Sequence, residues 1–312
     1  MGMPRERLLG GAFVKEARRV KRTMDEAIDE FVTALASGRK SSPNTLGAYR
    51  TDLRQLSDFL TRRGVRHWQE TTPALITDFV LHLREREYAT TSIARKVAAL
   101  KSFFQHLRAA NLIDTDPSAA LQAPRVAKEF PHALEPDEVA RLFQTVQSAA
   151  GIGQRDLAML HTIYSTGMRV TELISLNLHH VDLARGHVRC VSTNAARKER
   201  LLPLSLEAQK TLAAYIDGNR RALLRDVDEP ALFLNHHGQR LTRQGFWLII
   251  KGYARVAGIA DITPHTLRHS FALDMLGRGM ELRSVQELLG HANISTTHIY
   301  RQMRRAQLVT VP

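Results

Sequence analysis

The sequence of 312 residues contains one cysteine, Cys190, and this scarcity excludes several kinds of chemistry. A single thiol forms neither an intrachain disulfide nor the thiolate cluster of a zinc finger. The glycine-rich phosphate loop of ATPases and the HExxH motif of zinc proteases are also absent from the sequence. We therefore predict a protein that uses neither ATP nor a metal and that has no cofactor.

Long apolar runs are missing as well. No stretch approaches the roughly 20 apolar residues that a membrane-spanning helix requires. Hydrophobic residues make up 44% and charged residues 24% of the chain, which is close to the average of globular proteins. We expect a folded protein that is located in the cytoplasm and does not bind a membrane.

Positive charge is what the sequence has in excess. Lysine and arginine together number 44 against 31 aspartates and glutamates, so the formal net charge is +13. Such a surplus creates a field that attracts a polyphosphate backbone, which favours nucleic acid as the partner. Basic proteins of ribosomes and membrane surfaces share this property, so sequence motifs are needed to distinguish these classes.

The spacing of apolar residues predicts a helical bundle in the first third of the chain. Apolar residues recur at helical spacing from Ile28, and further helices follow Ser42 and Thr72, each of which precedes a proline suited to the first turn. A fourth helix follows Thr91. Between residues 111 and 131, three prolines interrupt any helix, which indicates a domain boundary.

Beyond this boundary the chain mixes helices with a small β-hairpin. Helices are expected at about 136–149 and 155–165, and a strand at 187–191 pairs with one at 200–204 before more helices follow. A chain of this length exceeds the usual size of a single core, which favours two domains. We predict a fold that is mainly α with a small β-sheet. Its parts are a basic arm at 1–23, a helical bundle at 24–110, a linker at 111–131 and a second domain at 132–312.

Three separate segments combine the residue types that handle a phosphodiester. Attack on phosphorus adds negative charge to the non-bridging oxygens, and planar guanidinium groups are well shaped to bind it. Arg169 and Arg268 are the candidates for this clamp. His265 precedes Arg268 by three residues on a predicted helix, so their side chains share a face and can reach one phosphate. The segments are TGMRVTEL at 166–173, PHTLRH at 264–269 and LGHANISTTHIY at 289–300.

Tyr300 is the candidate nucleophile. A phenol with a pKa of about 10 is a weak nucleophile at neutral pH, so it needs nearby cations or a base. His265 and His291 are the candidates for that task. A covalent phosphotyrosyl link stores the energy of the broken bond, so strands can be rejoined without ATP or a metal.

Each of these residues taken alone has a simpler structural explanation. A lone arginine is usually a surface charge, a lone histidine a polar contact, and a tyrosine a packing residue. Glu172 is most simply the partner that orients Arg169, and Gly290 most simply ends a helix. Five basic residues are equally consistent with solvated faces and with phosphate contacts: Lys96, Lys101, Arg301, Arg304 and Arg305.

The joint occurrence of the three segments decides between these interpretations. TGMRVTEL, HTLRHSFA and LGHANISTTHIY resemble, in this order, the words TGxRxxEL, HxLRHxFA and LGHxxxxTTxxY of the tyrosine recombinase, or phage integrase, family. The bacterial Xer-like and mobile-element members are the most similar. The resemblance spans roughly residues 24–305.

This resemblance implies both a fold and a function. The implied fold is an N-terminal SAM-like core-binding bundle and a C-terminal mixed α/β catalytic domain, which clamp double-stranded DNA between them. The implied site places Arg169, His265, Arg268 and His291 around a phosphate that Tyr300 attacks. Four subunits, all alike or of two kinds, are implied to assemble on two DNA duplexes.

One position departs from the family pattern. The family carries a lysine at the tip of the β-hairpin, in a GKGxKER-like word, which protonates the departing 5′ oxygen. The word here is STNAARKER at 192–200, which places Ala195 where the lysine is expected. Loss of this acid should slow cleavage by roughly 10²–10⁴-fold without changing the fold. Three interpretations are open: Lys198 substitutes from a shifted hairpin, the chain is an engineered slow variant, or another group serves as the acid.

Three functions fit these residues. The first is a site-specific DNA recombinase that cuts and rejoins strands through a covalent 3′-phosphotyrosyl intermediate. The second is a type IB topoisomerase, which uses similar chemistry on one duplex. The third is a catalytically impaired DNA-binding accessory factor, which the missing lysine would explain. The Xer-like words and the helical bundle favour the recombinase, and the retained arginines, histidines and Tyr300 argue against the accessory factor.

Overall fold

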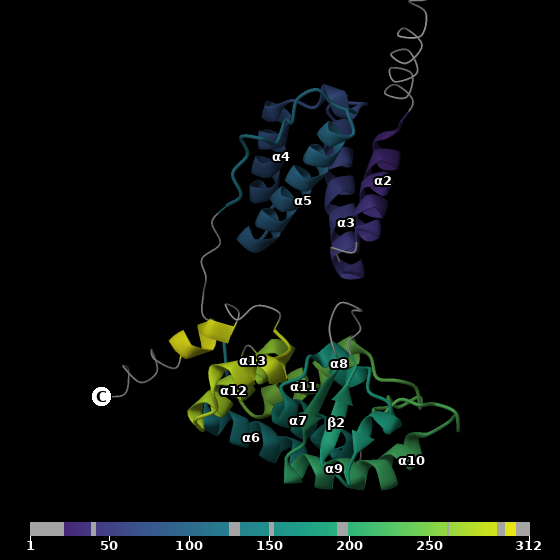
Figure 1. Ribbon diagram of the computed structural model, residues 1–312, viewed down its shortest axis with the longest axis vertical. Coiled ribbons are helices and arrows are strands. Elements are labelled where there is room, and N and C mark those ends of the chain that lie inside the picture. The colour runs from purple at the N-terminus through teal and green to yellow at the C-terminus, as the bar shows by residue number, and fades with distance from the viewer. Residues whose placement is uncertain are drawn as a thin grey trace, which may run out of the picture. The chain divides into compact units, whose positions relative to one another are not determined.

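The computed structural model describes residues 22–38, 42–124, 132–149, 153–191, 199–260, 262–291 and 297–303. The chain divides into two compact units, residues 1–128 and 129–312. Both units are mainly helical, and the second also holds a small sheet (Figure 1), so the predicted fold class is confirmed. Parts of the predictions lie outside the described residues: most of the basic arm, the hairpin tip at 192–198, Arg304 and Arg305.

Local capping signals set the beginnings of the helices in the first unit. The backbone N–H of Thr45 donates to Ser42 Oγ at 3.2 Å, and that of Leu75 donates to Thr72 Oγ1 at 3.3 Å, as the sequence predicts. The fourth helix begins before Thr91, because backbone bonds to the Ala89 carbonyl start it without any side-chain cap. The helices are α2 (Met24–Ser37), α3 (Pro43–Thr61), α4 (Pro73–Glu85) and α5 (Thr90–Ala109), with a 3₁₀ turn η1 (Trp68–Glu70).

Aromatic rings fill the interior of this unit. The Trp68 ring meets the Phe103 ring edge to face at a centroid distance of 4.8 Å, and Phe31 meets Phe103 at 5.4 Å. Such pairs contribute roughly 0.5–1.5 kcal/mol beyond the area they bury. The Trp68 Nε1–H donates to the Met24 carbonyl at 3.1 Å, so the one polar group of this ring is satisfied. The aromatic core therefore joins α2, η1 and α5.

A buried ion pair lies beside this core. Lys96 is 5% exposed, and its ammonium donates to Asp52 at 2.8 Å and to Gln55 at 2.6 Å, while Arg95 also contacts Asp52. Lys101 donates to the carbonyl of Leu121 at 2.9 Å. Neither sequence interpretation of Lys96 is right, because its side chain is neither a solvated charge nor accessible to a phosphate.

The second unit contains a three-stranded antiparallel sheet in the order β1-β2-β3. Val188 pairs with Leu202, and both side chains are buried in the core of this unit. The strands are β1 (Val181–Asp182), β2 (His187–Cys190) and β3 (Arg200–Pro203). The last two match the predicted hairpin, whereas β1 was not predicted because two residues show no alternation.

Helices pack around this sheet (Figure 1). They are α6 (Pro136–Gln147), α7 (Gly153–Thr166), α8 (Val170–Ile174), α9 (Leu206–Asp217), α10 (Asn219–Leu223), α11 (Arg243–Val256), α12 (Pro264–Gly277) and α13 (Leu282–Leu289), with a 3₁₀ turn η2 (Leu178–His180). Residues 297–303 are also helical. Across the described ranges, no helix combines the length and apolar character needed to cross a bilayer.

Candidate active site

Two glycines in the left-handed conformation shape the site. Gly167 follows the end of α7 with φ of +60°, and Gly290 ends α13 with φ of +62°. Glycine adopts this conformation without the penalty that a Cβ brings. At Gly167 a Cβ would also overlap the Phe271 ring, and at Gly290 it would overlap the Arg200 guanidinium. Each turn therefore leaves its backbone carbonyls close to arginine side chains.

Arg268 joins the three segments that the sequence singles out. It lies on α12 with 3% of its surface exposed. One guanidinium nitrogen donates to the Gly167 carbonyl and the other to the Leu289 carbonyl, both at 2.5 Å. Burial lowers the pKa of Arg268 to about 9, with a contribution from the charge of Arg169, so the group is still a cation at neutral pH.

Glu172 holds two arginines in place. One of its carboxylate oxygens accepts from the Arg169 backbone N–H at 2.7 Å and the other lies 3.2 Å from the Arg169 guanidinium, which supports the orienting role expected from the sequence. Arg200 of β3 pairs with the same carboxylate at 3.0 Å. Burial opposes the charge of Glu172, but the bonds and charges of the two arginines outweigh it and hold its pKa below the ordinary value.

His265 lies near the same cations. The side chain is exposed at the beginning of α12, one turn before Arg268. Partial desolvation and the charges of Arg243, Arg268 and Arg169 lower its pKa. His265 therefore shares one electrostatic environment with the two arginines of the predicted clamp.

Tyr300 lies against this cluster, in the helical segment 297–303. The side chain is 2% exposed, and its hydroxyl is 2.8 Å from His269 Nδ1. Burial raises the pKa of Tyr300, although the charges of Arg268 and Arg169 act in the opposite direction. The candidate nucleophile is thus a buried, protonated phenol close to two guanidinium groups.

His291 contacts Tyr300 through its ring. The two rings lie nearly parallel, at 16°, with centroids 6.3 Å apart. His291 Nδ1 is 3.0 Å from the Thr297 hydroxyl, which belongs to the same helical segment as Tyr300. The structure therefore brings Arg169, His265, Arg268, His291 and Tyr300 together, as the sequence predicts.

His269 is the residue that sequence reasoning missed. The sequence suggested His265 and His291 as groups that assist Tyr300, whereas the structure places His269 against its hydroxyl. Its presence in the word HTLRH was the only signal, and nothing in that word separates its two histidines. Desolvation, together with His265 and Arg268, lowers the pKa of His269 to about 4, so its imidazole is neutral near pH 7.

Lys198 and Ala195 lie outside the described residues, so the substitution of Lys198 for the hairpin lysine stays a prediction. Arg200, the last residue of the segment 192–200, is described and begins β3. Its side chain is 13% exposed and reaches Glu172 and the Cys190 thiol. The return strand of the hairpin is therefore fixed to the residue that also holds Arg169.

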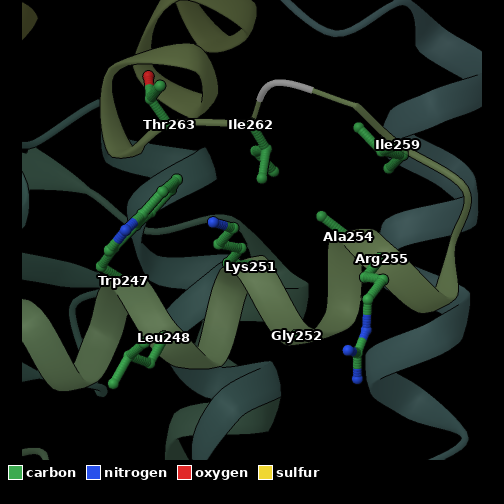
Figure 2. A pocket seen from close by; sticks show the side chains of 9 residues that line it. All are labelled: Trp247, Leu248, Lys251, Gly252, Ala254, Arg255, Ile259, Ile262 and Thr263. Carbon is green, nitrogen blue, oxygen red and sulfur yellow. The ribbon is translucent and has the colours of Figure 1, made fainter.

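A separate hollow lies between α11 and the segment that leads to α12 (Figure 2). Trp247 and Lys251 line one side, and Ile259 and Ile262 line the other. None of the candidate catalytic side chains lines this hollow. Within the described ranges, no group of three or more His, Cys, Asp or Glu side chains is arranged to hold a metal ion.

Both units match known protein families. Residues 132–307 match the model of the phage integrase family, and residues 28–111 match that of the phage integrase N-terminal SAM-like domain. The second match covers the helical bundle of the first unit, and the first covers all of the candidate catalytic residues.

Relatives of similar length are tyrosine recombinases. The chain is 46% identical to tyrosine recombinase XerC of Roseiflexus sp. over 91% of both chains. It is 39% identical to tyrosine recombinase XerD of Halalkalibacterium halodurans, over 92% of this chain and 96% of the relative. A solved structure of XerH site-specific recombinase bound to a difH substrate shares the fold with a TM-score of 0.71 and 19% identity, over 90% of this chain and 82% of the other.

Proposed function

Since this chain belongs to the phage integrase family, it is a tyrosine-type site-specific recombinase, and we propose that it joins DNA covalently to Tyr300 through a 3′-phosphotyrosyl link. The observation that carries the proposal is the position of the Tyr300 hydroxyl beside His269 and within the electrostatic reach of Arg169 and Arg268. A nucleophile and a pair of anion-binding cations are the groups that phosphoryl transfer needs.

The two arginines have the geometry of a clamp for the non-bridging oxygens. The Arg268 guanidinium is held by two backbone carbonyls, and the Arg169 guanidinium is held by the Glu172 carboxylate, so both side chains are already oriented before DNA binds. Such preorganisation stabilises the charge that develops in the transition state. His265 and His291 supply further hydrogen bonds to the phosphate, and Lys198 is the candidate acid for the departing 5′ oxygen.

Recombination requires exchange of four strands, so we expect four copies of the active site on two duplexes of double-stranded DNA. The subunits are either all of this chain or of this chain and a related recombinase. The XerH site-specific recombinase, whose solved structure shares the fold, is bound in that structure to a palindromic difH substrate. We expect the reaction to take place in the cytoplasm.

Covalent capture of labelled DNA tests the proposal. A nicked duplex that traps the intermediate should mark the wild-type protein, and Tyr300→Phe should abolish the mark. Tyr164→Phe is the matched control, because Tyr164 lies in the same unit and its ring packs against Phe143. A mark that persists in Tyr300→Phe, or a wild-type protein that is never marked, would contradict the proposed role of Tyr300.

The topology of the products separates the alternatives. Exchange of flanking sequences between two duplexes identifies a recombinase, whereas relaxation of one supercoiled duplex without exchange identifies a type IB topoisomerase. The family assignment favours exchange.

A further inference from the structure

We propose that His269 is the general base of this reaction, with its Nδ1 accepting the proton of the Tyr300 hydroxyl as the tyrosine oxygen attacks phosphorus. This inference rests on the proposed function, because it requires that Tyr300 attack DNA. The Nδ1 to hydroxyl distance of 2.8 Å is already within the range that proton transfer needs.

The other histidines of the cluster are less well placed for this task. Among the described residues, His269 is the one whose side chain hydrogen-bonds the Tyr300 hydroxyl. The Nδ1 atom of His291 faces the Thr297 hydroxyl at 3.0 Å, and its ring centroid is 6.3 Å from that of Tyr300, compared with 5.5 Å for His269. His265 lies one turn before His269 on α12, and its ring centroid is 6.3 Å from that of His269.

The protonation states of the pair suit this direction of transfer. Desolvation, His265 and Arg268 lower the pKa of His269 to about 4, and burial raises the pKa of Tyr300. Near neutral pH the imidazole is therefore neutral and able to accept, and the phenol keeps the proton to be donated. Nδ1 accepts in the tautomer that carries its proton on Nε2.

Bound DNA would make His269 a stronger base. The groups that act on its imidazole are His265 and Arg268 from α12 and Tyr300 from segment 297–303, and none of them is an anion near pH 7. An imidazolium is therefore disfavoured in the free protein. A phosphate bound by Arg268 adds negative charge nearby, which favours the protonated imidazole. His269 thus becomes a stronger base only when the DNA phosphate is bound.

The step balances without a cofactor. The Tyr300 O–H bond breaks and its proton moves to His269 Nδ1, while the tyrosine oxygen forms a bond to phosphorus. The bond from phosphorus to the 5′ oxygen breaks, and that oxygen takes a proton from a separate acid, Lys198 or water. On rejoining, a 5′ hydroxyl attacks phosphorus and returns its proton to the deprotonated form of that acid, and the leaving tyrosine oxygen recovers its proton from His269.

Substitution by asparagine separates proton transfer from hydrogen bonding. The amide oxygen of His269→Asn occupies nearly the position of Nδ1 and accepts a hydrogen bond, but it does not hold a proton. Single-turnover cleavage is measured with a 5′-bridging phosphorothiolate, whose sulfur departs unprotonated, so that the acid for the leaving group does not limit the rate. His237→Asn serves as the matched control, because His237 is exposed on a loop of the same unit.

We expect His269→Asn and His269→Ala to cleave roughly 10²–10⁴-fold more slowly than wild type at pH 7, with unchanged DNA affinity. The wild-type rate should fall as the pH is lowered and His269 takes up its proton. The deficit of His269→Asn should shrink as the pH rises toward ionisation of Tyr300, because a phenolate needs no base. His237→Asn should match wild type throughout.

Other outcomes overturn the inference. Cleavage by His269→Asn at the wild-type rate would mean that a hydrogen bond suffices, and a deficit that is the same at every pH would mean a structural role. A wild-type protein that forms no covalent product would instead refute the proposed function. A second measurement uses Tyr300→Phe, in which His269 is intact and DNA is not cleaved. The pKa of the His269 imidazole, followed by NMR, should rise when DNA binds. An unchanged pKa would exclude His269 as the general base.

Discussion

Replacing Glu172 by glutamine tests how much the ion pairs of Glu172 with Arg169 and Arg200 contribute to stability. The Glu172 side chain is 4% exposed and pairs with Arg200 and Arg169, whose side chains are 13% and 23% exposed. Glutamine keeps the size of the side chain and removes its charge. The two guanidinium groups then lie close together without the anion that compensates them.

Breaking a buried ion pair by removing one partner costs about 3–5 kcal/mol. We expect roughly 3 kcal/mol, the lower end of that range, because water partly screens Arg169, which is 23% exposed. For a unit of this size the midpoint of thermal unfolding should fall by roughly 6–12 °C. The assay is thermal unfolding of the full chain without DNA. Glu207→Gln is the control, because Glu207 pairs with Lys210 at 2.9 Å on the surface and should leave the midpoint unchanged.

The difference in unfolding midpoint between wild type and Glu172→Gln should depend on pH in a definite direction. The pKa of Glu172 is lowered in the folded protein, so its contribution to stability is fully present above its unfolded-state pKa and is lost as the pH falls through the folded-state pKa. The gap in midpoint between wild type and Glu172→Gln should therefore narrow as the pH falls below about 4.5, the ordinary value. Equal midpoints for Glu172→Gln and Glu207→Gln at pH 7, or a gap that stays constant to pH 3, would refute the reasoning.

Three further predictions follow from local geometry. Gly167→Ala should destabilise the protein by more than about 1 kcal/mol in urea unfolding, because φ is +60° and the added Cβ would overlap the Phe271 ring; an unchanged urea midpoint would contradict this. Asp52→Asn should cost roughly 3–5 kcal/mol, since it leaves the buried Lys96 without its anion, and Lys96→Met in the same chain should restore much of the loss. A substrate with a 5′-bridging sulfur should be cleaved faster than ordinary DNA, because its sulfur departs without the acid that the family lysine would supply at the position of Ala195; equal rates would indicate that Lys198 or another acid already serves.

Local signals in the sequence predicted much of this molecule. Ser42 and Thr72 cap their helices because an N-cap bond joins residues three apart, so its partners are visible in a short stretch of sequence. The three candidate segments are also visible in the sequence, because their residue types are those suited to binding and attacking a phosphate. Arg169, Arg268 and Tyr300 could therefore be chosen from the sequence alone.

The sequence by itself determined the fold class, the family and the residue types of the site. Only the tertiary structure decided which histidine hydrogen-bonds the Tyr300 hydroxyl, since His269 and Tyr300 are 31 residues apart. It also decided that Glu172 holds Arg200 across 28 residues and that Lys96 is buried with Asp52. Side chains so distant in sequence meet through the packing of whole helices and strands, and no local pattern records which face of one element will meet another. For this reason the candidate nucleophile was visible in the sequence, whereas its neighbour at hydrogen-bonding distance was not.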